Sequence, residues 1–159
     1  SQGSYNRFNS TRPSSTVVTL GSDDHTNKND NDFIMYNFCN VDGFSKSGSY
    51  TGNGSLDGPF LYTGFKPAFV IIKRTNTSNN WIMLDNKRDP YNEAIRVLFP
   101  NDATAEDAGT GANDLDFLSN GIKITEDNGE CNGDGDSYIY LAFAEAPLVG
   151  SNNVPCTAR

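Results

Sequence analysis

The chain has 159 residues and a formal net charge of −8 at pH 7. Such an acidic surface argues against nucleic-acid partners and against docking on anionic membranes, since phosphate groups attract basic surfaces. The length fits one domain, and no apolar run approaches the roughly 18 residues that a membrane-spanning helix needs, so we expect no membrane insertion.

The composition favours an all-β fold. Hydrophobic residues make up 36% of the chain and aromatic residues 11%. The aromatic residues gather in short runs, while Asn, Ser, Thr and Gly fill the segments between them. A disordered chain would lack such runs. We therefore expect short strands joined by turns, with little helix.

The first residues of the chain differ in character from the rest. Residues 1–15 are polar and show no hydrophobic period, so we interpret them as an arm outside the core. Tyr5 and Phe8 are the candidates in this arm for contact with a neighbouring subunit. Residues 16–159 are predicted to form a single β-sandwich domain.

Two aromatic segments about a hundred residues apart share one pattern. They are residues 32–41 (DFIMYNFCNV) and residues 136–147 (DSYIYLAFAEAP), and each follows a polar, acidic loop and a shorter strand-like segment. Alternate side chains of a strand share one face. Both segments are therefore predicted to be central strands of one core. The expected core stripes are Ile34, Tyr36 and Phe38 in the first segment and Ile139, Leu141 and Phe143 in the second.

The middle of the chain predicts a hairpin. Residues 66–74 have a continuous apolar centre between charged ends, which is typical of a strand buried on both faces. Residues 80–85 are its expected partner strand. Residues 93–99 fit either a helical turn or a strand, and their length does not decide between them.

A second hairpin is predicted at residues 115–125. Two alternating segments flank Asn120 and Gly121, which we expect to form a type I′ turn with positive φ angles. Counting every strand-like segment gives about nine or ten short strands. This number fits an antiparallel β-sandwich, similar to a jelly roll.

The cysteine and histidine content argues against zinc and against catalysis. Cys39, Cys131 and Cys156 include no Cys-x-x-Cys pair, and His25 is the one histidine, so a structural zinc site is not expected. Three free thiols are expected, with a Cys131–Cys156 disulfide as the alternative. His25 lies in a polar loop, and no serine has a Gly-x-Ser-x-Gly context, so we expect no enzyme.

An acidic loop at residues 127–136 (DNGECNGDGD) places oxygen donors at alternate positions among glycines. Hard cations favour such ligands, which makes Asp127, Asp134 and Asp136 candidate calcium ligands. The loop lacks the spacing of an EF-hand, and similar loops are often plain turns. No cofactor is therefore required by the sequence.

A sugar site commonly combines an exposed aromatic ring with polar side chains. The candidate residues for glycan contact are Trp81, Asp85, Arg88 and Tyr91. A tryptophan within an alternating strand is also explained by packing in a core or an interface.

The sequence also resembles a known family. Residues 48–92, from GSYTGNG to KRDPYN, closely resemble a domain of uncharacterised function in structural proteins of tailed phages, namely tail-fibre and tail-associated proteins that are frequent in marine phages. Residues 116–124 (DFLSNGIKI) and 136–159, with the motif Ala-Phe-Ala-Glu-x-Pro, look like later segments of that domain. The resemblance begins near Val17, and residues 1–15 have no counterpart in it.

The resemblance implies a non-enzymatic structural or adhesive module of the virion, extracellular when released. It implies homo-oligomers, contacts with other virion proteins, and contact with the host surface. A host cell-surface glycan is a candidate partner, although the resemblance weakens the interpretation of Trp81 as a sugar contact. The family brings no established catalytic or binding residues. The alternatives are a carbohydrate-binding or calcium-dependent adhesion module and a subunit of an extracellular filament joined through residues 1–15.

Overall fold

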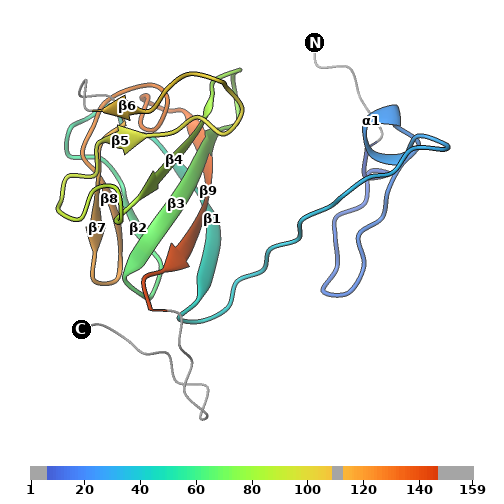
Figure 1. Ribbon diagram of the computed structural model, residues 1–159, viewed down its shortest axis with the longest axis horizontal. Coiled ribbons are helices and arrows are strands. Elements are labelled where there is room, and N and C mark those ends of the chain that lie inside the picture. The colour runs from blue at the N-terminus through green and yellow to red at the C-terminus, as the bar shows by residue number, and fades with distance from the viewer. Residues whose placement is uncertain (1–6, 109–112, 147–159) are drawn as a thin grey trace. The chain divides into compact units, whose positions relative to one another are not determined.

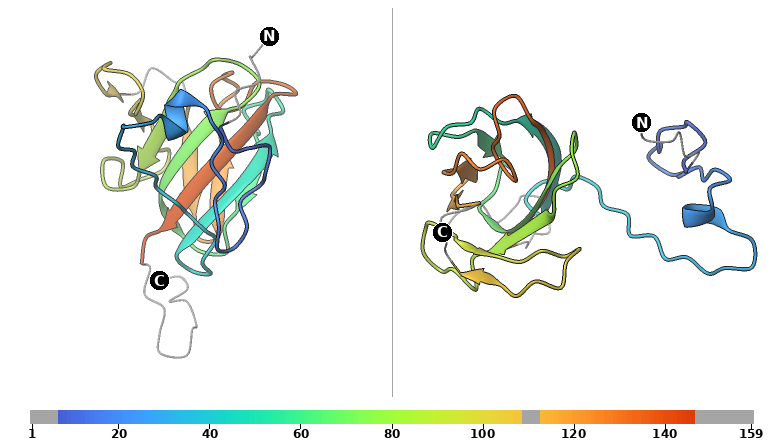
Figure 2. Two further views of the ribbon diagram at one scale, coloured as in Figure 1. Left: turned by 90° about the vertical axis from the view of Figure 1, so that its right-hand side faces the viewer. Right: turned by 90° about the horizontal axis from the view of Figure 1, so that it is seen from above.

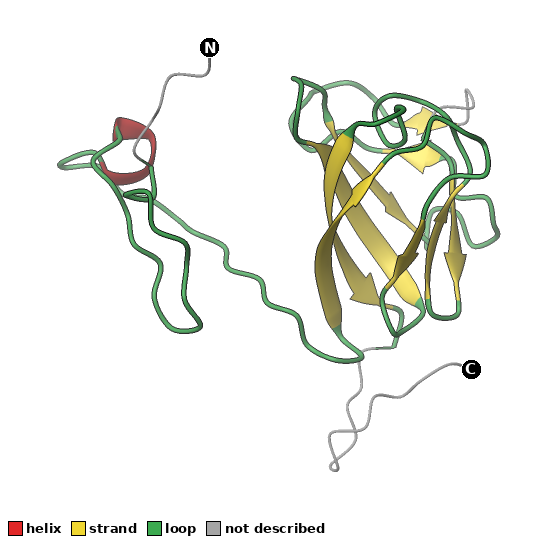
Figure 3. Cartoon of the chain, turned by 180° about the vertical axis from the view of Figure 1, so that it is seen from behind, coloured by secondary structure: helices red, strands yellow, loops and turns green. Residues whose placement is uncertain are grey.

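A computed structural model of the chain describes residues 7–108 and 113–146. The chain forms two compact units, Ser1–Phe38 and Cys39–Arg159. The one described helix, α1 (Asp24–Asn27), lies in the first unit, and all nine described strands lie in the second (Figure 1 and Figure 3). No helix in these ranges is long and apolar enough to cross a membrane.

The larger sheet has four antiparallel strands. Its order is β1 (Ser45–Thr51), β9 (Ser137–Ala144), β3 (Pro67–Arg74) and β4 (Trp81–Asp85). Strands β9 and β3 occupy the centre, which fits their long runs of β-branched and aromatic residues. Strands β1 and β4 are the two edges.

The smaller sheet has three antiparallel strands in the order β2 (Phe60–Tyr62), β8 (Gly121–Ile124) and β7 (Leu115–Leu118). A two-stranded ribbon of β5 (Arg96–Val97) and β6 (Asp107–Ala108) lies beside them. The view from above in Figure 2 shows the two sheets as separate layers. The predicted antiparallel β-sandwich with little helix is confirmed.

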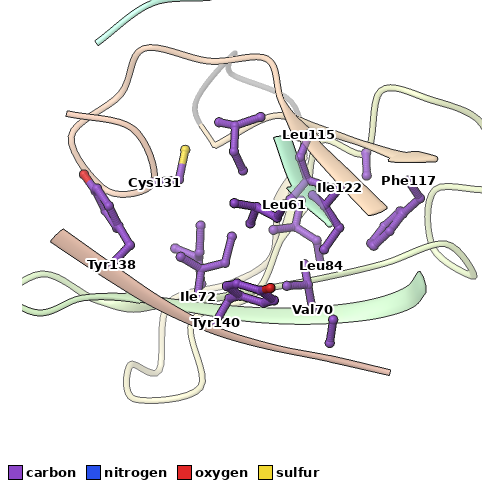
Figure 4. Close-up of a cluster of buried hydrophobic side chains, with 14 of the residues drawn as sticks. Leu61, Val70, Ile72, Leu84, Leu115, Phe117, Ile122, Cys131, Tyr138 and Tyr140 are labelled. Carbon is purple, nitrogen blue, oxygen red and sulfur yellow. The ribbon is translucent and has the colours of Figure 1, made fainter. Parts of the chain in front are cut away.

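The core fills the space between the two layers (Figure 4). Both sheets contribute fully buried aliphatic side chains, and each such side chain contributes about 1.5–3 kcal/mol to folding. The core residues are Leu61, Val70, Ile72, Ile82, Leu84, Ala94, Val97, Leu115, Phe117, Ile122, Ile124, Cys131, Tyr138, Tyr140 and Ala142.

Residues 32–41 do not form a core strand, so that prediction was wrong. Ile34 is 81% exposed and Tyr36 78% exposed. The shorter strand-like segment that precedes residues 32–41 is not a strand either, since residues 16–20 carry no strand in the described chain. Aromatic residues at strand spacing show that a segment can form a β-strand, but they do not show that another strand lies beside it to pair with. The compact units divide at 38/39, whereas the predicted boundary lay at 15/16.

Strand β9 is central as predicted, but its buried face is the opposite one. Tyr138, Tyr140 and Ala142 face the core, while Ile139 is 42% exposed. Both faces of this strand are apolar, so alternation alone could not choose between them. The predicted stripe of Ile139, Leu141 and Phe143 lies on the outside of the sandwich.

Tyr138 can lie in the core because its hydroxyl group is hydrogen-bonded. The hydroxyl donates to the carbonyl of Gly129 at 2.8 Å and accepts from the N–H of Gly133 at 2.8 Å. Its ring stacks on that of Tyr50, with centroids 4.9 Å apart. A buried phenol with both roles filled carries little of the usual cost of burying a polar group.

Both predicted hairpins are present, β3 with β4 and β7 with β8. The type I′ turn is not, because neither Asn120 nor Gly121 has a positive φ angle. Gly121 serves another purpose, since a Cβ there would clash with the carbonyl oxygen of Leu61 on β2. Residues 93–99 contain the short strand β5 and no helix.

The two described cysteines are free thiols, and Cys156 lies outside the described residues. Cys39 is exposed and Cys131 is buried. Burial, reinforced by nearby carboxylates, raises the pKa of Cys131 to about 12. The Cys131 thiol is therefore neutral at physiological pH and acts as a core residue.

Candidate functional site

A surface pocket of about 410 Å³ lies where the loop after β4 meets the segment before β3, the end of β9 and strand β7. Its lining mixes charged, amide and aromatic side chains. The lining residues are Lys66, Asn86, Lys87, Asp89, Pro90, Tyr91, Asn92, Phe117 and Glu145.

Side chains of the loop itself hold this pocket in place. The Asp89 carboxylate accepts hydrogen bonds from the backbone N–H groups of Ile95 (2.9 Å) and Arg96 (2.7 Å). The Asn92 side chain accepts from the N–H of Phe117 at 3.0 Å and donates to its carbonyl at 3.2 Å. The amide thus pairs with β7 as a neighbouring strand would, and it fixes the loop that carries Tyr91 beside that strand.

Glu145 is one of two carboxylates in the pocket lining, the other being Asp89. Its carboxylate lies 2.8 Å from the Nζ of Lys66 and accepts a hydrogen bond from the Nδ2 of Asn86 at 3.0 Å. The hydrogen bond from Lys66 holds the pKa of Glu145 below its usual value, against the upward effect of burial. Tyr91 is 83% exposed beside these groups. An exposed ring next to fixed donors and acceptors suits a polyhydroxylated ligand.

The four predicted glycan residues do not form one site. Only Tyr91 lines the pocket. Trp81 and Asp85 begin and end strand β4. The four steps along the strand from one to the other separate them by about 13 Å. Arg88 is held in a network, 2.6 Å from Asp85 and 2.9 Å from Glu106.

The same network sets the ionisation of Asp85. Burial raises the pKa of its carboxyl group, but hydrogen bonds from Arg88 and Lys87 outweigh burial, and the net shift is downward. Asp85 is therefore a charged partner of Arg88 that positions the loop after β4. The sequence alone marked these side chains as ligand contacts, whereas they bind each other.

Trp81 lies instead on what we call the outer sheet face, the side of the larger sheet turned away from the core. Cross-strand register aligns its apolar side chains as neighbours, Ile71 with Met83 and with Leu141, for example. Trp81 is 37% exposed at its margin. The apolar residues of the outer sheet face are Phe69, Ile71, Trp81, Met83, Ile139, Leu141 and Phe143.

The candidate calcium ligands are not gathered into a site. Asp136 lies 2.6 Å from Arg74 and accepts a hydrogen bond from Asn76 at 2.9 Å. Asp127 and Asp134 are exposed. Across the two described ranges, no three His, Cys, Asp or Glu side chains are close enough together to hold a metal ion.

The acidic loop has a structural role that depends on Asn132, a residue that sequence reasoning missed. Its side chain is fully buried and joins this loop to the loop after β1. The two backbones touch so closely that a Cβ at Gly52 would clash with the carbonyl oxygen of Gly133. The sequence signal was the asparagine next to a glycine, in a loop that we interpreted only as candidate calcium ligands or as a plain turn.

The remaining predicted residues lie in the first unit. Asp23 caps α1 by accepting the backbone N–H of His25 at 2.9 Å, and this hydrogen bond holds the pKa of Asp23 below its usual value. The Nδ1 of His25 lies 3.0 Å from the same carboxylate oxygen. Phe8 is 46% exposed, and Tyr5 lies outside the described residues.

Residues 1–147 match a family described as a domain of unknown function, DUF7483. The chain belongs to this family. No curated protein and no solved structure matches it. The DUF7483 match spans both compact units, so the segment before residue 39 is part of the family's sequence as much as the sandwich is.

Proposed function

We propose that this chain is a non-enzymatic structural and adhesive module of a phage particle, in which copies of the chain pack together and present a surface to the host. The observation that carries the proposal is the outer sheet face. Contiguous apolar side chains on the outside of a sandwich mark a surface that a partner buries. The resemblance to tail-fibre and tail-associated proteins supports the phage assignment.

The charge of the chain sets conditions on this packing. Two copies that each carry a net charge of −8 repel each other at long range. The charged side chains of the outer sheet face are Lys73, between Trp81 and Ile139, and the paired Asp85 at its border, while strand β1 adds small uncharged residues. Association through this face should therefore strengthen as salt screens the repulsion.

Sedimentation of the full chain over a range of concentrations tests the assembly. We expect self-association that Ile139→Asp weakens by about tenfold, because the carboxylate would have to be buried in the contact. Tyr62→Asp is the matched control, since Tyr62 is 62% exposed on the other sheet. A chain that stays monomeric at every concentration and salt would contradict the assembly.

The phage assignment has its own test. Antibodies raised against the purified chain should label the tails of phage particles purified from cells that carry the gene, as seen by immunogold electron microscopy. Self-association without any label on particles would favour a filament subunit of another kind.

The pocket at Tyr91 favours glycan binding as a second function of the same module. A glycan array should show binding that Tyr91→Ala weakens by about tenfold, because the sugar would lose its stacking surface. Tyr62→Ala removes another exposed tyrosine, one that is not part of the pocket lining, and should leave binding unchanged. Equal losses in both variants would place the contact elsewhere.

A further inference from the structure

Most sheet edges in this sandwich are closed by the chain itself. On β4, Met83 exchanges both backbone hydrogen bonds with Leu98, and the N–H of Trp81 donates to the Asn101 side chain. On β7, Leu115 exchanges both backbone hydrogen bonds with Ala94. The Asn92 side chain forms hydrogen bonds with the N–H and the carbonyl of Phe117, the next residue whose backbone groups point outward. Strand β2 is only three residues long. These are the usual ways in which proteins protect an edge.

Strand β1 is the exception. It has seven residues, and among the described residues no strand pairs with its outer side. Ser45 turns its N–H and carbonyl outward, since both bond to Val41. Backbone groups alternate along a strand, so Ser47, Ser49 and Thr51 turn theirs to the same side. This edge carries no proline, and its outward residues are small and uncharged.

Side chains stop the hairpin that begins at this edge. Continuing from the Val41–Ser45 pair, the next hydrogen-bonded pair would be Cys39 with Ser47. The Asn40 side chain instead accepts the N–H of Ser47 at 2.7 Å, and the Ser45 hydroxyl donates to the carbonyl of Cys39 at 2.7 Å. The N–H of Ser47 and the carbonyl of Cys39, which would form one of the two hydrogen bonds of that pair, are thus already used.

Residues 33–37, which precede Cys39, have the sequence of a β-strand but pair with no sheet among the described residues. Phe33, Ile34, Met35 and Tyr36 are all exposed, at 46%, 81%, 50% and 78%. Residues 33–37 contain no charge, proline or glycine. Such a sequence has a high tendency to form a strand and to pair with an open edge.

We propose that residues 33–37 of one copy add as an extra strand to the open part of the β1 edge, Ser49–Thr51, of a second copy, with Tyr36 opposite Ser49. This rests on the proposed function, because it names how neighbouring modules join. The occupant is a second copy because the same chain carries both the open edge and the exposed strand-like segment, while Asn40 and Ser45 block pairing within the chain. Each copy then donates one strand and accepts one.

Cross-linking between two variants tests this pairing. In a background of Cys39→Ser and Cys156→Ser, one protein carries Tyr36→Cys and the other Ser49→Cys. On mild oxidation of the mixture we expect a disulfide-linked heterodimer at a yield about tenfold above that of either protein alone. The matched control replaces Tyr36→Cys with Leu20→Cys, a residue 41% exposed in the same unit, and should give no such product.

A backbone variant tests the edge directly. Ser49→Pro removes an N–H that faces away from β9, so the β1–β9 pairing survives while the added strand loses a hydrogen bond. We expect Ser49→Pro to weaken self-association about tenfold and Ser49→Ala, which keeps the N–H, to leave it unchanged. Near- and far-ultraviolet circular dichroism of each variant checks that the sandwich is intact.

The outcomes separate this inference from the proposed function. A disulfide within one chain carrying both Tyr36→Cys and Ser49→Cys, with no heterodimer in the mixture, would overturn exchange between copies. Self-association that Ile139→Asp weakens but Ser49→Pro does not would overturn the strand exchange and leave the assembly standing. A chain that is monomeric under all conditions would overturn both.

Discussion

Replacing Asn132 with alanine is expected to lower the free energy of unfolding by about 3 kcal/mol, since several hydrogen-bonding groups lose a partner together. The buried Nδ2 donates to the side chain of Asn53 at 3.0 Å and to the carbonyls of Ser55 (2.8 Å) and Glu126 (2.9 Å). The Oδ1 accepts the N–H of Asn53 at 2.9 Å. Alanine fills none of these roles.

Denaturant unfolding followed by tryptophan fluorescence measures this effect. The control is Asn120→Ala, at an exposed position in the turn between β7 and β8, where we expect a change below about 0.5 kcal/mol. If both asparagine variants unfold at the same denaturant concentration as the parent chain, the two loops are not joined as described.

The second large effect is expected at Ile72, which is fully buried on strand β3. Ile72→Ala should lower the free energy of unfolding by about 3–4 kcal/mol, from lost apolar burial and from the cavity left between the sheets. Ile71 is its chain neighbour, has the same side chain, and lies half-buried on the outer sheet face. Ile71→Ala should cost about 1 kcal/mol.

These two isoleucines also separate folding from assembly. Denaturant unfolding of the isolated chain should rank Ile72→Ala far below Ile71→Ala, whereas sedimentation should show weaker self-association for Ile71→Ala. Equal loss of stability in the two variants would mean that β3 is buried on both faces, and the outer sheet face would then not be a surface for partners.

The sequence predicted the elements whose signals are local. The apolar centre of residues 66–74 and the alternation of residues 115–125 identified β3 and the β7–β8 hairpin. The aromatic run at residues 136–147 identified β9. In each of these, propensity and the tertiary environment agree, so a strand-like pattern became a strand.

Local pattern failed where a partner decides the outcome. Residues 32–38 have the same pattern as β9, yet they carry no regular secondary structure. On the buried face of β9, the Tyr138 hydroxyl forms hydrogen bonds with the backbone of a loop, and the alternation of the sequence does not reveal these partners. The periodicity of one segment predicts neither where a partner strand lies nor where a distant carbonyl group lies.

The candidate site was partly predictable for the same reason. Tyr91 was among the glycan candidates, and its exposure agrees with the turn sequence Asp89-Pro90 before it, since turns place side chains on the surface. Lys66 and Glu145 are far apart in the chain and meet only because β3 pairs with β9. The interpretation of Asp85 and Arg88 as ligand contacts was wrong, because these two opposite charges, three residues apart, form an ion pair with each other.

The order of strands also constrains how the protein is made. Strand β9 lies between β1 and β3, yet it follows both in the chain. During synthesis the larger sheet lacks one of its two central strands until β9 leaves the ribosome. Until then, the edges of β1 and β3 that pair with β9 have unpaired backbone groups, and nearby apolar side chains remain exposed. The nascent sandwich is therefore most prone to aggregate in the interval before β9 emerges, and closure of this sheet is a late step of folding.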